Sequence, residues 1–299
     1  MNPLKKFLAI AIAMIVPFAL VGSANAADET VSATTNLKPR SGSFYKEKSV
    51  SSDLRIDVDV TTPPSSPLVN PLKNVKIDFP AGMTFNPNNK KTPVCSDAKL
   101  STQSNLADPS GVVNSCKNSV VGTGTAVIIL AKINNNPNTV IDDPILVAFN
   151  GGKTGKGEPK VKIYGYSKTT NVGILMNGTL KGRVFDVAIP VLSNDSAVRH
   201  FDLSYPGPRL VRQDLGIDTR GLDPNFVQAR CASSPLVTNA TFELGERTYP
   251  GGQPTTPTTT VQSPQTEQNC TGLAGKAKLK VQKVAGPNAV KKGRKGAFK

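Results

Sequence analysis

Hydrophobic and polar residues alternate along most of the chain between residues 50 and 245. In residues 54–60, Leu, Ile and Val alternate with Arg and Asp, and residues 75–79 repeat this pattern before Pro80. A period of two is typical of half-buried antiparallel strands, which turn one set of side chains to a core and the other to solvent. Seven further apolar or alternating runs complete a set of nine predicted strands, at residues 122–130, 143–149, 159–167, 171–182, 183–192, 200–207 and 236–245.

Turn-forming residues separate these runs, with Gly, Pro, Asn and Asp gathered in segments such as NNNPN and NGGKTGKGEP. Short strands at this spacing predict an all-β fold, an antiparallel β-sandwich of Ig-like or jelly-roll-like type over residues 50–248. Residues 95–104 favour at most a short helix, and no other amphipathic helix is predicted. Residues 27–49 are expected to form an N-terminal arm or an edge strand.

The first 26 residues have the pattern of a secretory signal peptide. Lys5 and Lys6 precede the apolar run 7–21, and Ala24 and Ala26 occupy the small-residue positions of a cleavage site. The apolar run is shorter than the roughly 20 residues that a bilayer span needs. We therefore expect cleavage after Ala26 and a secreted, extracellular or wall-associated protein with no membrane span in the mature chain.

Four cysteines, an even number in an oxidising compartment, indicate disulfide bonds. Three pairings are possible, and Cys95–Cys116 with Cys231–Cys270 is favoured because each pair brackets a short local segment. Each loop closure is expected to stabilise the fold by about 3–4 kcal/mol. A zinc site is disfavoured, since there is no C-x-x-C and His200 is the only histidine.

The composition changes after Tyr249. Residues 249–269 are rich in Pro, Thr and Gln and hold few apolar side chains, which predicts a flexible, disordered loop. An interdomain linker is the alternative interpretation of this segment. Beyond it, residues 270–299 form a basic tail or the start of a truncated Ig-like module.

The positive charge is concentrated at the two ends. The net charge is +15, but the body is nearly balanced, because two basic residues lie in the first 26 residues and nine in the last 26. Export and a balanced body argue against nucleic-acid binding. The nine tail residues are candidates for binding an anionic cell-wall polymer, with another envelope protein as the alternative partner: Lys276, Lys278, Lys280, Lys283, Lys291, Lys292, Arg294, Lys295 and Lys299.

Two resemblances add to this interpretation. The segments FPAGMTFNP, VCSDAKL and CKNSVVGTGTA, together with RCASSPLVTNATFELGERTYPGG and QNCTG, resemble a pattern in large secreted β-rich proteins of actinobacteria. This resemblance spans residues 50–272, implies a secreted all-β module and the local cysteine pairing, and implies no activity. The tail segment AKLKVQKVAGPNAVKKGRKGAFK resembles the first two strands of a CARDB-type Ig-like adhesion module.

Candidate catalytic and metal-binding residues are sparse. A Ser-His-Asp triad would need His200 with Asp195, Asp202 and Ser204, but no G-x-S-x-G motif accompanies them. The segment GGKTGKGEP lacks the spacing of a phosphate loop and predicts a hairpin turn. Oxygen donors for calcium are limited to five loop acids, Asp142, Asp143, Asp214, Asp218 and Asp223. The paired carboxylates of a glycan hydrolase would have to come from three glutamates, Glu158, Glu243 and Glu246.

These observations predict a secreted, non-enzymatic β-sandwich protein with a structural or adhesive role at the cell envelope and no cofactor. A carbohydrate-binding module or an extracellular glycan-active hydrolase is the alternative. The absence of tryptophan argues against an indole platform for stacking sugar rings.

Overall fold

The computed structural model describes residues 29–61, 70–101, 106–130, 139–190, 196–247 and 254–270. Its strands form one 15-stranded antiparallel sheet and a second sheet of two strands. The predicted all-β class is therefore confirmed. The predicted signal peptide and the nine basic residues of the tail lie outside the described residues.

All nine predicted strands are present close to their predicted positions. The alternation in β2 buries Leu54, Ile56 and Val58, which are at most 1% exposed, and leaves the intervening Arg55 and Asp59 exposed. Inward apolar side chains of the other strands join them in one core. The nine strands are β2 (Val50–Thr61), β3 (Leu72–Asp78), β5 (Val120–Leu130), β7 (Ile145–Lys153), β8 (Pro159–Ser167), β9 (Val172–Lys181), β10 (Val184–Ala188), β11 (Ser196–Tyr205) and β15 (Leu236–Arg247).

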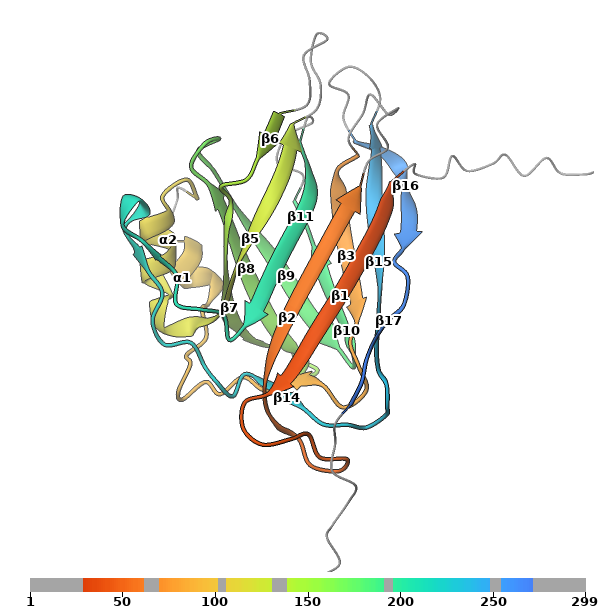
Figure 1. Cartoon of the computed structure of the whole chain (residues 1–299). Coiled ribbons are helices and arrows are strands. Elements are labelled where there is room, and N and C mark those ends of the chain that lie inside the picture. Colours follow the sequence, from red (N-terminus) through yellow and green to blue (C-terminus); the bar gives the residue numbers. More distant parts are fainter. Residues whose placement is uncertain are drawn as a thin grey trace, which may run out of the picture.

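The long sheet folds back on itself into a sandwich. In Figure 1, β5, β11, β2 and β1 (Thr30–Pro39) form one layer, and β8, β9, β10 and β3 lie behind it. Strand β1, at the expected arm or edge position, pairs with β2 along its whole length. Its other side meets β17 (Thr266–Gln268), where the Gln268 amide accepts from Leu37 N at 2.9 Å and donates to Leu37 O at 2.6 Å. This side-chain contact joins β1 to β17 where the two layers meet.

The Thr/Pro-rich segment differs from the prediction of a flexible loop. Residues 254–262 form β16 (Pro254–Gln262), which pairs with β15, and β17 pairs with the start of the same strand. Composition predicted disorder because few apolar groups are available for burial. The prediction missed that the free edge of β15 offers backbone hydrogen bonds, which suit a polar strand.

A second, smaller core lies outside the sandwich. Two short helices, α1 (Asp97–Ser101) and α2 (Pro109–Ser115), pack with buried residues such as Phe149 of β7 and Tyr164 of β8. The short helix in residues 95–104 was predicted, whereas α2 was not. Its sequence signal is an N-cap: Asp108 accepts from Gly111 N at 3.0 Å, and Pro109 follows at the start of the helix.

The remaining elements are short and close the ends of the fold. They are β4 (Thr84–Phe85), η1 (Lys117–Ser119), β6 (Thr139–Ile141), β12 (Val211–Arg212), η2 (Gln213–Leu215), β13 (Ile217–Asp218) and β14 (Val227–Ala229). Strands β4 and β14 pair with each other at the end of the sandwich where β2 begins. Across the described part of the chain, no helix has the length and apolar content needed to cross a membrane.

Both predicted disulfides are confirmed. Cys95 bonds to Cys116 and Cys231 to Cys270, with Cα–Cα distances of 5.5 and 5.9 Å, and no cysteine is free. Such crosslinks are typical of an extracellular or otherwise oxidising environment. The first disulfide joins the residues before α1 to the residue that follows α2. The second joins the end of β17 to the residues after β14.

Candidate functional site

The interior of the sandwich is filled by aromatic rings at one end. Phe79, Phe85, Phe185, Tyr205 and Phe226 are at most 2% exposed, and neighbouring ring centroids lie 5.1–6.0 Å apart. Stacked and edge-to-face contacts of this kind stabilise a core beyond the area that they bury. We call this region, near β4 and β14, the packed end.

The opposite part of the interior holds a cavity of about 100 Å³. Its lining comes from eight strands of both layers and is almost entirely apolar, with Leu146 and Met176 among its side chains, and it extends to Phe185 of the packed end. Ile174, Ile189, Val198 and Phe201 also line it and are only partly buried. We call this region, where β7 and β9 begin and β5 and β8 end, the open end.

A small residue helps to explain why the open end is not filled. Ala126 of β5 stands in the lining among larger aliphatic residues. Gly165 of β8 also lines the cavity but leaves no space of its own, because a Cβ there would lie only 3.2 Å from Ile174 Cγ1 and 3.3 Å from Leu146 Cδ2. Rigid strands keep the two layers apart, so the neighbouring side chains do not collapse into the space beside Ala126.

The turn between β8 and β9, beside the open end, is held by polar contacts. Asp143 accepts hydrogen bonds from Ser167 Oγ at 2.7 Å and from Thr169 N at 2.8 Å. Partial burial opposes ionisation of Asp143, but these hydrogen bonds outweigh it and lower its pKa below the usual value. Next to this turn, Val172 lines the cavity and is 38% exposed.

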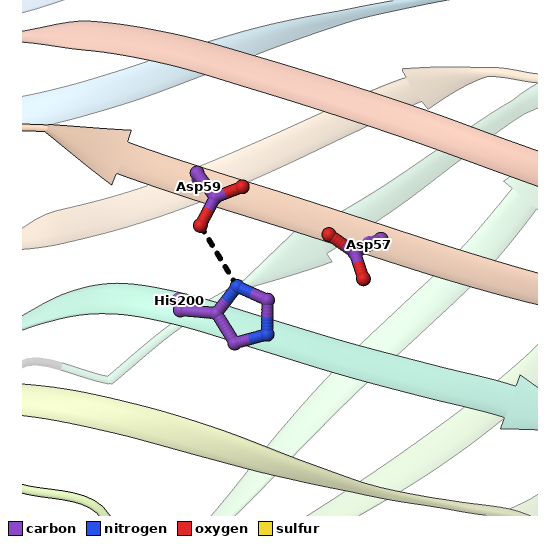
Figure 2. A group of neighbouring side chains, drawn as sticks. All are labelled: Asp57, Asp59 and His200. Carbon is purple, nitrogen blue, oxygen red and sulfur yellow. Dashed lines mark hydrogen bonds and ion pairs between the residues drawn. The ribbon is translucent and has the colours of Figure 1, made fainter.

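A second cluster lies on the outer face of the sheet, on β2 and β11. Antiparallel pairing sets His200 opposite Asp59 and Asp202 opposite Asp57. Figure 2 shows the His200 ring lying between the two aspartates, with Nδ1 2.9 Å from Asp59 Oδ1. One potential ligand atom from each of Asp57, Asp59 and His200 lies within 4.8 Å of the others. Among the described residues, this is the group of carboxylates and imidazole that could hold a metal ion.

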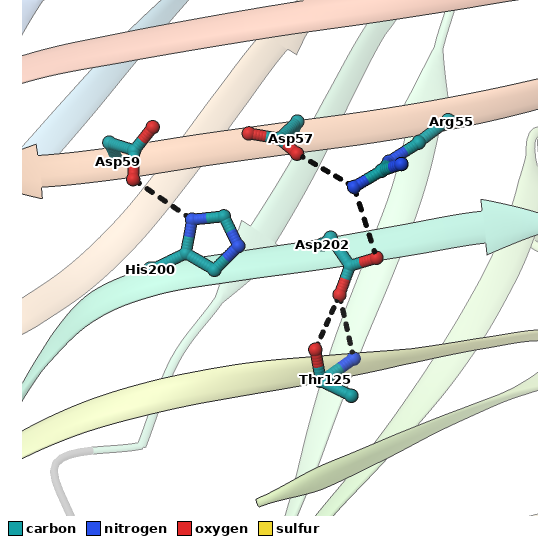
Figure 3. A network of polar contacts seen from close by, with 6 residues as sticks. All are labelled: Arg55, Asp57, Asp59, Thr125, His200 and Asp202. Atoms are coloured by element: carbon teal, nitrogen blue, oxygen red, sulfur yellow. Dashed lines mark hydrogen bonds and ion pairs between the residues drawn. The ribbon is translucent and has the colours of Figure 1, made fainter. Parts of the chain in front are cut away.

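Further polar contacts order this cluster, as Figure 3 shows. Arg55 Nη2 lies 3.2 Å from Asp57 Oδ2 and 3.7 Å from Asp202 Oδ2. Asp202 Oδ1 accepts from Thr125 N at 3.0 Å and from Thr125 Oγ1 at 2.6 Å. Asp202 is therefore fixed by β5 and Arg55, whereas Asp57 and Asp59 each have one side-chain partner in Figure 3.

The residues considered for a catalytic triad do not come together as one. His200 lies within β11 and contacts Asp59, a residue 141 positions away that sequence reasoning did not single out. Asp202 is engaged by Arg55 and Thr125 instead, and Asp195 lies outside the described residues. The signal that could have found Asp57 and Asp59 is their place on the polar face of the first predicted strand, but sequence does not reveal which strand pairs with it.

The loop acids considered for calcium lie with separate partners. Asp143 holds the turn after β8, and Asp223 accepts from Thr92 Oγ1 at 3.1 Å. Asp214 pairs with Arg212 and Lys168, and Asp218 with Arg209 and Arg220. Hydrogen bonds from these cations lower the pKa of both carboxyls, that of Asp218 to about 2. These acids therefore form local ion pairs and turn contacts.

The other candidate segments also have structural partners. Glu158 accepts from Thr154 within the hairpin between β7 and β8, so the predicted turn at GGKTGKGEP is confirmed. Glu243 pairs with Lys76 Nζ at 2.5 Å across β15 and β3. The side chain of Glu246 is not among those that the structure describes.

Comparisons with protein-family models, with curated proteins and with solved structures found no match. The resemblances to actinobacterial β-rich proteins and to a CARDB-type module stay predictions. What the molecule does is therefore inferred from the chemistry of its cavity and of its outer-face cluster.

Proposed function

We propose that this protein is an exported, non-enzymatic binding module of the cell envelope that holds an apolar group in the open end of its sandwich. The cavity of about 100 Å³ with its apolar lining carries this proposal. Cavities lined by Leu, Ile and Phe stay dry, and one of about 150 Å³ accepts benzene. The occupant is expected to be a small ring or the end of an alkyl chain, with the rest of the ligand outside the cavity.

The chemistry of the lining supports binding over catalysis. Tyr166 is the single titratable residue among the lining residues, and its hydroxyl lies 3.1 Å from Asn171 Oδ1. General acid–base catalysis needs a side chain that can exchange a proton with the bound group. An apolar lining supplies shape and dispersion contacts instead, which suits retention of an unreactive chain.

The envelope role expected from the sequence is compatible with this binding function. It rests on the predicted signal peptide and basic tail, and the two disulfides agree with an oxidising location. Under this proposal the tail would hold the module at an anionic wall polymer while the sandwich binds the apolar group.

The methionines offer a direct test by nuclear magnetic resonance. Beyond the predicted signal peptide the chain has two methionines. Met176 lines the cavity, whereas Met83 is buried in the core and is not among the lining residues. With ¹³C-labelled methionine methyls, titration with toluene and with alkanols of increasing length should shift the Met176 signal and leave that of Met83 in place.

A matched pair of variants locates the binding. Ala126→Leu adds bulk in the cavity, whereas Ala188→Leu makes the same change at an exposed position of β10, between two lining residues. Filling should weaken toluene binding by at least about tenfold, the loss of roughly 1.4 kcal/mol, and the exposed change should not. Equal shifts of both methionines, or equal affinity in both variants, would refute the proposal.

A further inference from the structure

We propose that Asp57, Asp59 and His200 form a binding site for a divalent transition-metal ion, with Zn²⁺ as its representative. The site lies on the outer face of β2 and β11 and is separate from the cavity. Its three side chains project from two hydrogen-bonded strands. The backbone therefore fixes their separation, and only side-chain rotation is needed to close the site.

The distances are compatible with a metal centre after a small adjustment. His200 Nδ1 and Asp59 Oδ1 are 2.9 Å apart. Two ligand atoms about 2.1 Å from a tetrahedral Zn²⁺ lie about 3.4 Å apart, so this pair has to open by about 0.5 Å to bind the ion. Asp57 offers an oxygen within 4.8 Å of the other ligand atoms, and rotation about its side-chain bonds would bring that oxygen closer.

The donor set favours a transition metal over calcium or magnesium. Imidazole and carboxylate together suit zinc and its neighbours, whereas hard cations prefer a shell of oxygen ligands. The side chains of Asp57, Asp59 and His200 are 31%, 56% and 29% exposed. Solvent therefore reaches the cluster, and water can supply the remaining ligands.

Metal binding would replace the contacts that the three side chains now make. His200 must offer Nδ1 as a lone pair, so the proton shared between Nδ1 and Asp59 moves to Nε2 or to solvent. Asp57 must release Arg55, which keeps Asp202 as its second carboxylate partner. Arg55 is thus a competitor of the metal for Asp57 and a means of testing the assignment.

The chain offers little competition from other strong ligands. His200 is its only histidine, and all four cysteines are in disulfides. The imidazole resonances of the protein therefore report on this one residue. Untagged protein is required, because a histidine tag would bind the same ions.

The experiment is calorimetric titration of the untagged, disulfide-bonded protein with Zn²⁺, together with the His200 imidazole spectrum. We expect one Zn²⁺ per chain and a shift of the Nδ1 resonance. His200→Gln and Asp59→Asn should each weaken binding by at least about tenfold, a typical effect of disturbing a metal site. Arg55→Gln should tighten binding, since it frees Asp57.

Asp53→Asn is the matched control. Asp53 lies on the same strand and pairs with Arg40 at 2.5 Å, outside the cluster. Its replacement should leave Zn²⁺ affinity unchanged. All these side chains are on the surface, so circular dichroism should show an unaltered fold in each variant. Absence of Zn²⁺ binding to the unmodified chain, or binding that His200→Gln leaves intact, would overturn the proposal.

Discussion

The two ends of the sandwich interior are built differently, although β10 and β11 contribute side chains to both. At the packed end, five aromatic side chains interlock and are at most 2% exposed. At the open end, mostly aliphatic side chains, together with Phe185 and Phe201, surround a cavity, and several of them stay partly exposed. The two ends thus differ in how completely side chains fill the space between the layers.

One crosslink lies at the packed end, and the other belongs to the smaller core outside the sandwich. Cys95 N donates to Asn150 O near the end of β7, and Cys116 precedes the start of β5, both away from the cavity. Cys231 N donates to Tyr45 O just beyond β14, which is at the packed end. A covalently fixed, well-packed end allows the other end to remain unfilled, because stability need not come from every layer of the core.

The largest expected effect is the loss of an aromatic ring at the packed end. Phe226→Ala should lower the free energy of unfolding by about 3–5 kcal/mol, since it leaves a cavity among rigid neighbours. Val198→Ala at the open end should cost about 1 kcal/mol, because that side chain is partly exposed and borders space already. Chemical denaturation of both variants measures the contrast, and equal losses would show that the two ends pack alike.

Removal of the Cys231–Cys270 bond should be next in size. The double variant Cys231→Ala/Cys270→Ala opens a loop of 39 residues and is expected to cost about 4 kcal/mol. Cys95→Ala/Cys116→Ala, which opens a shorter loop, is the comparison and should cost slightly less. Denaturation under non-reducing conditions gives both values. If the ends are independent, the Met176 response to toluene persists in each variant that still folds.

A gain in stability is expected from Tyr205→Phe at the packed end. The Tyr205 hydroxyl is buried and has no hydrogen-bond partner among the described residues, and burial raises the pKa of this phenol. Removing an unsatisfied buried hydroxyl should stabilise the fold by about 1 kcal/mol while the ring contacts remain. The melting temperature of the variant tests this, and a clear decrease would indicate that the hydroxyl has a partner after all.

The smallest effect concerns the turn beside the open end and depends on pH. Asp143→Asn should destabilise the fold by about 0.5–1 kcal/mol at neutral pH, because the carboxylate accepts two hydrogen bonds that hold the turn. Since the pKa of Asp143 is lowered in the folded state, its contribution is present above the unfolded-state pKa of about 3.9 and is lost as pH falls below it.

Urea unfolding at pH 7, 5 and 3 checks this linkage. The difference between the unmodified chain and Asp143→Asn should be the same at pH 7 and 5 and should shrink at pH 3. A difference that grows on acidification would mean that the folded state raises this pKa.

The sequence by itself determined the strands and the covalent frame. In a strand such as residues 54–60, successive side chains point alternately to the core and to solvent, so the alternation of apolar and polar residues can be detected locally. The cysteine pairs were predictable because each closes a short loop. Two segments without strand-like alternation were missed: α2, which begins at the Asp108 cap and buries Val112 and Val113, and β16, which pairs with the free edge of β15.

Only the tertiary structure decided where the two candidate sites lie. Asp57 and His200 are distant in the chain and become neighbours because β2 pairs with β11, a choice among many possible partners that no local pattern encodes. The cavity depends on the summed volumes of side chains from eight strands, including the small Ala126. A void is a property of the whole assembled interior, since each residue that borders it would look like an ordinary core residue in its own strand.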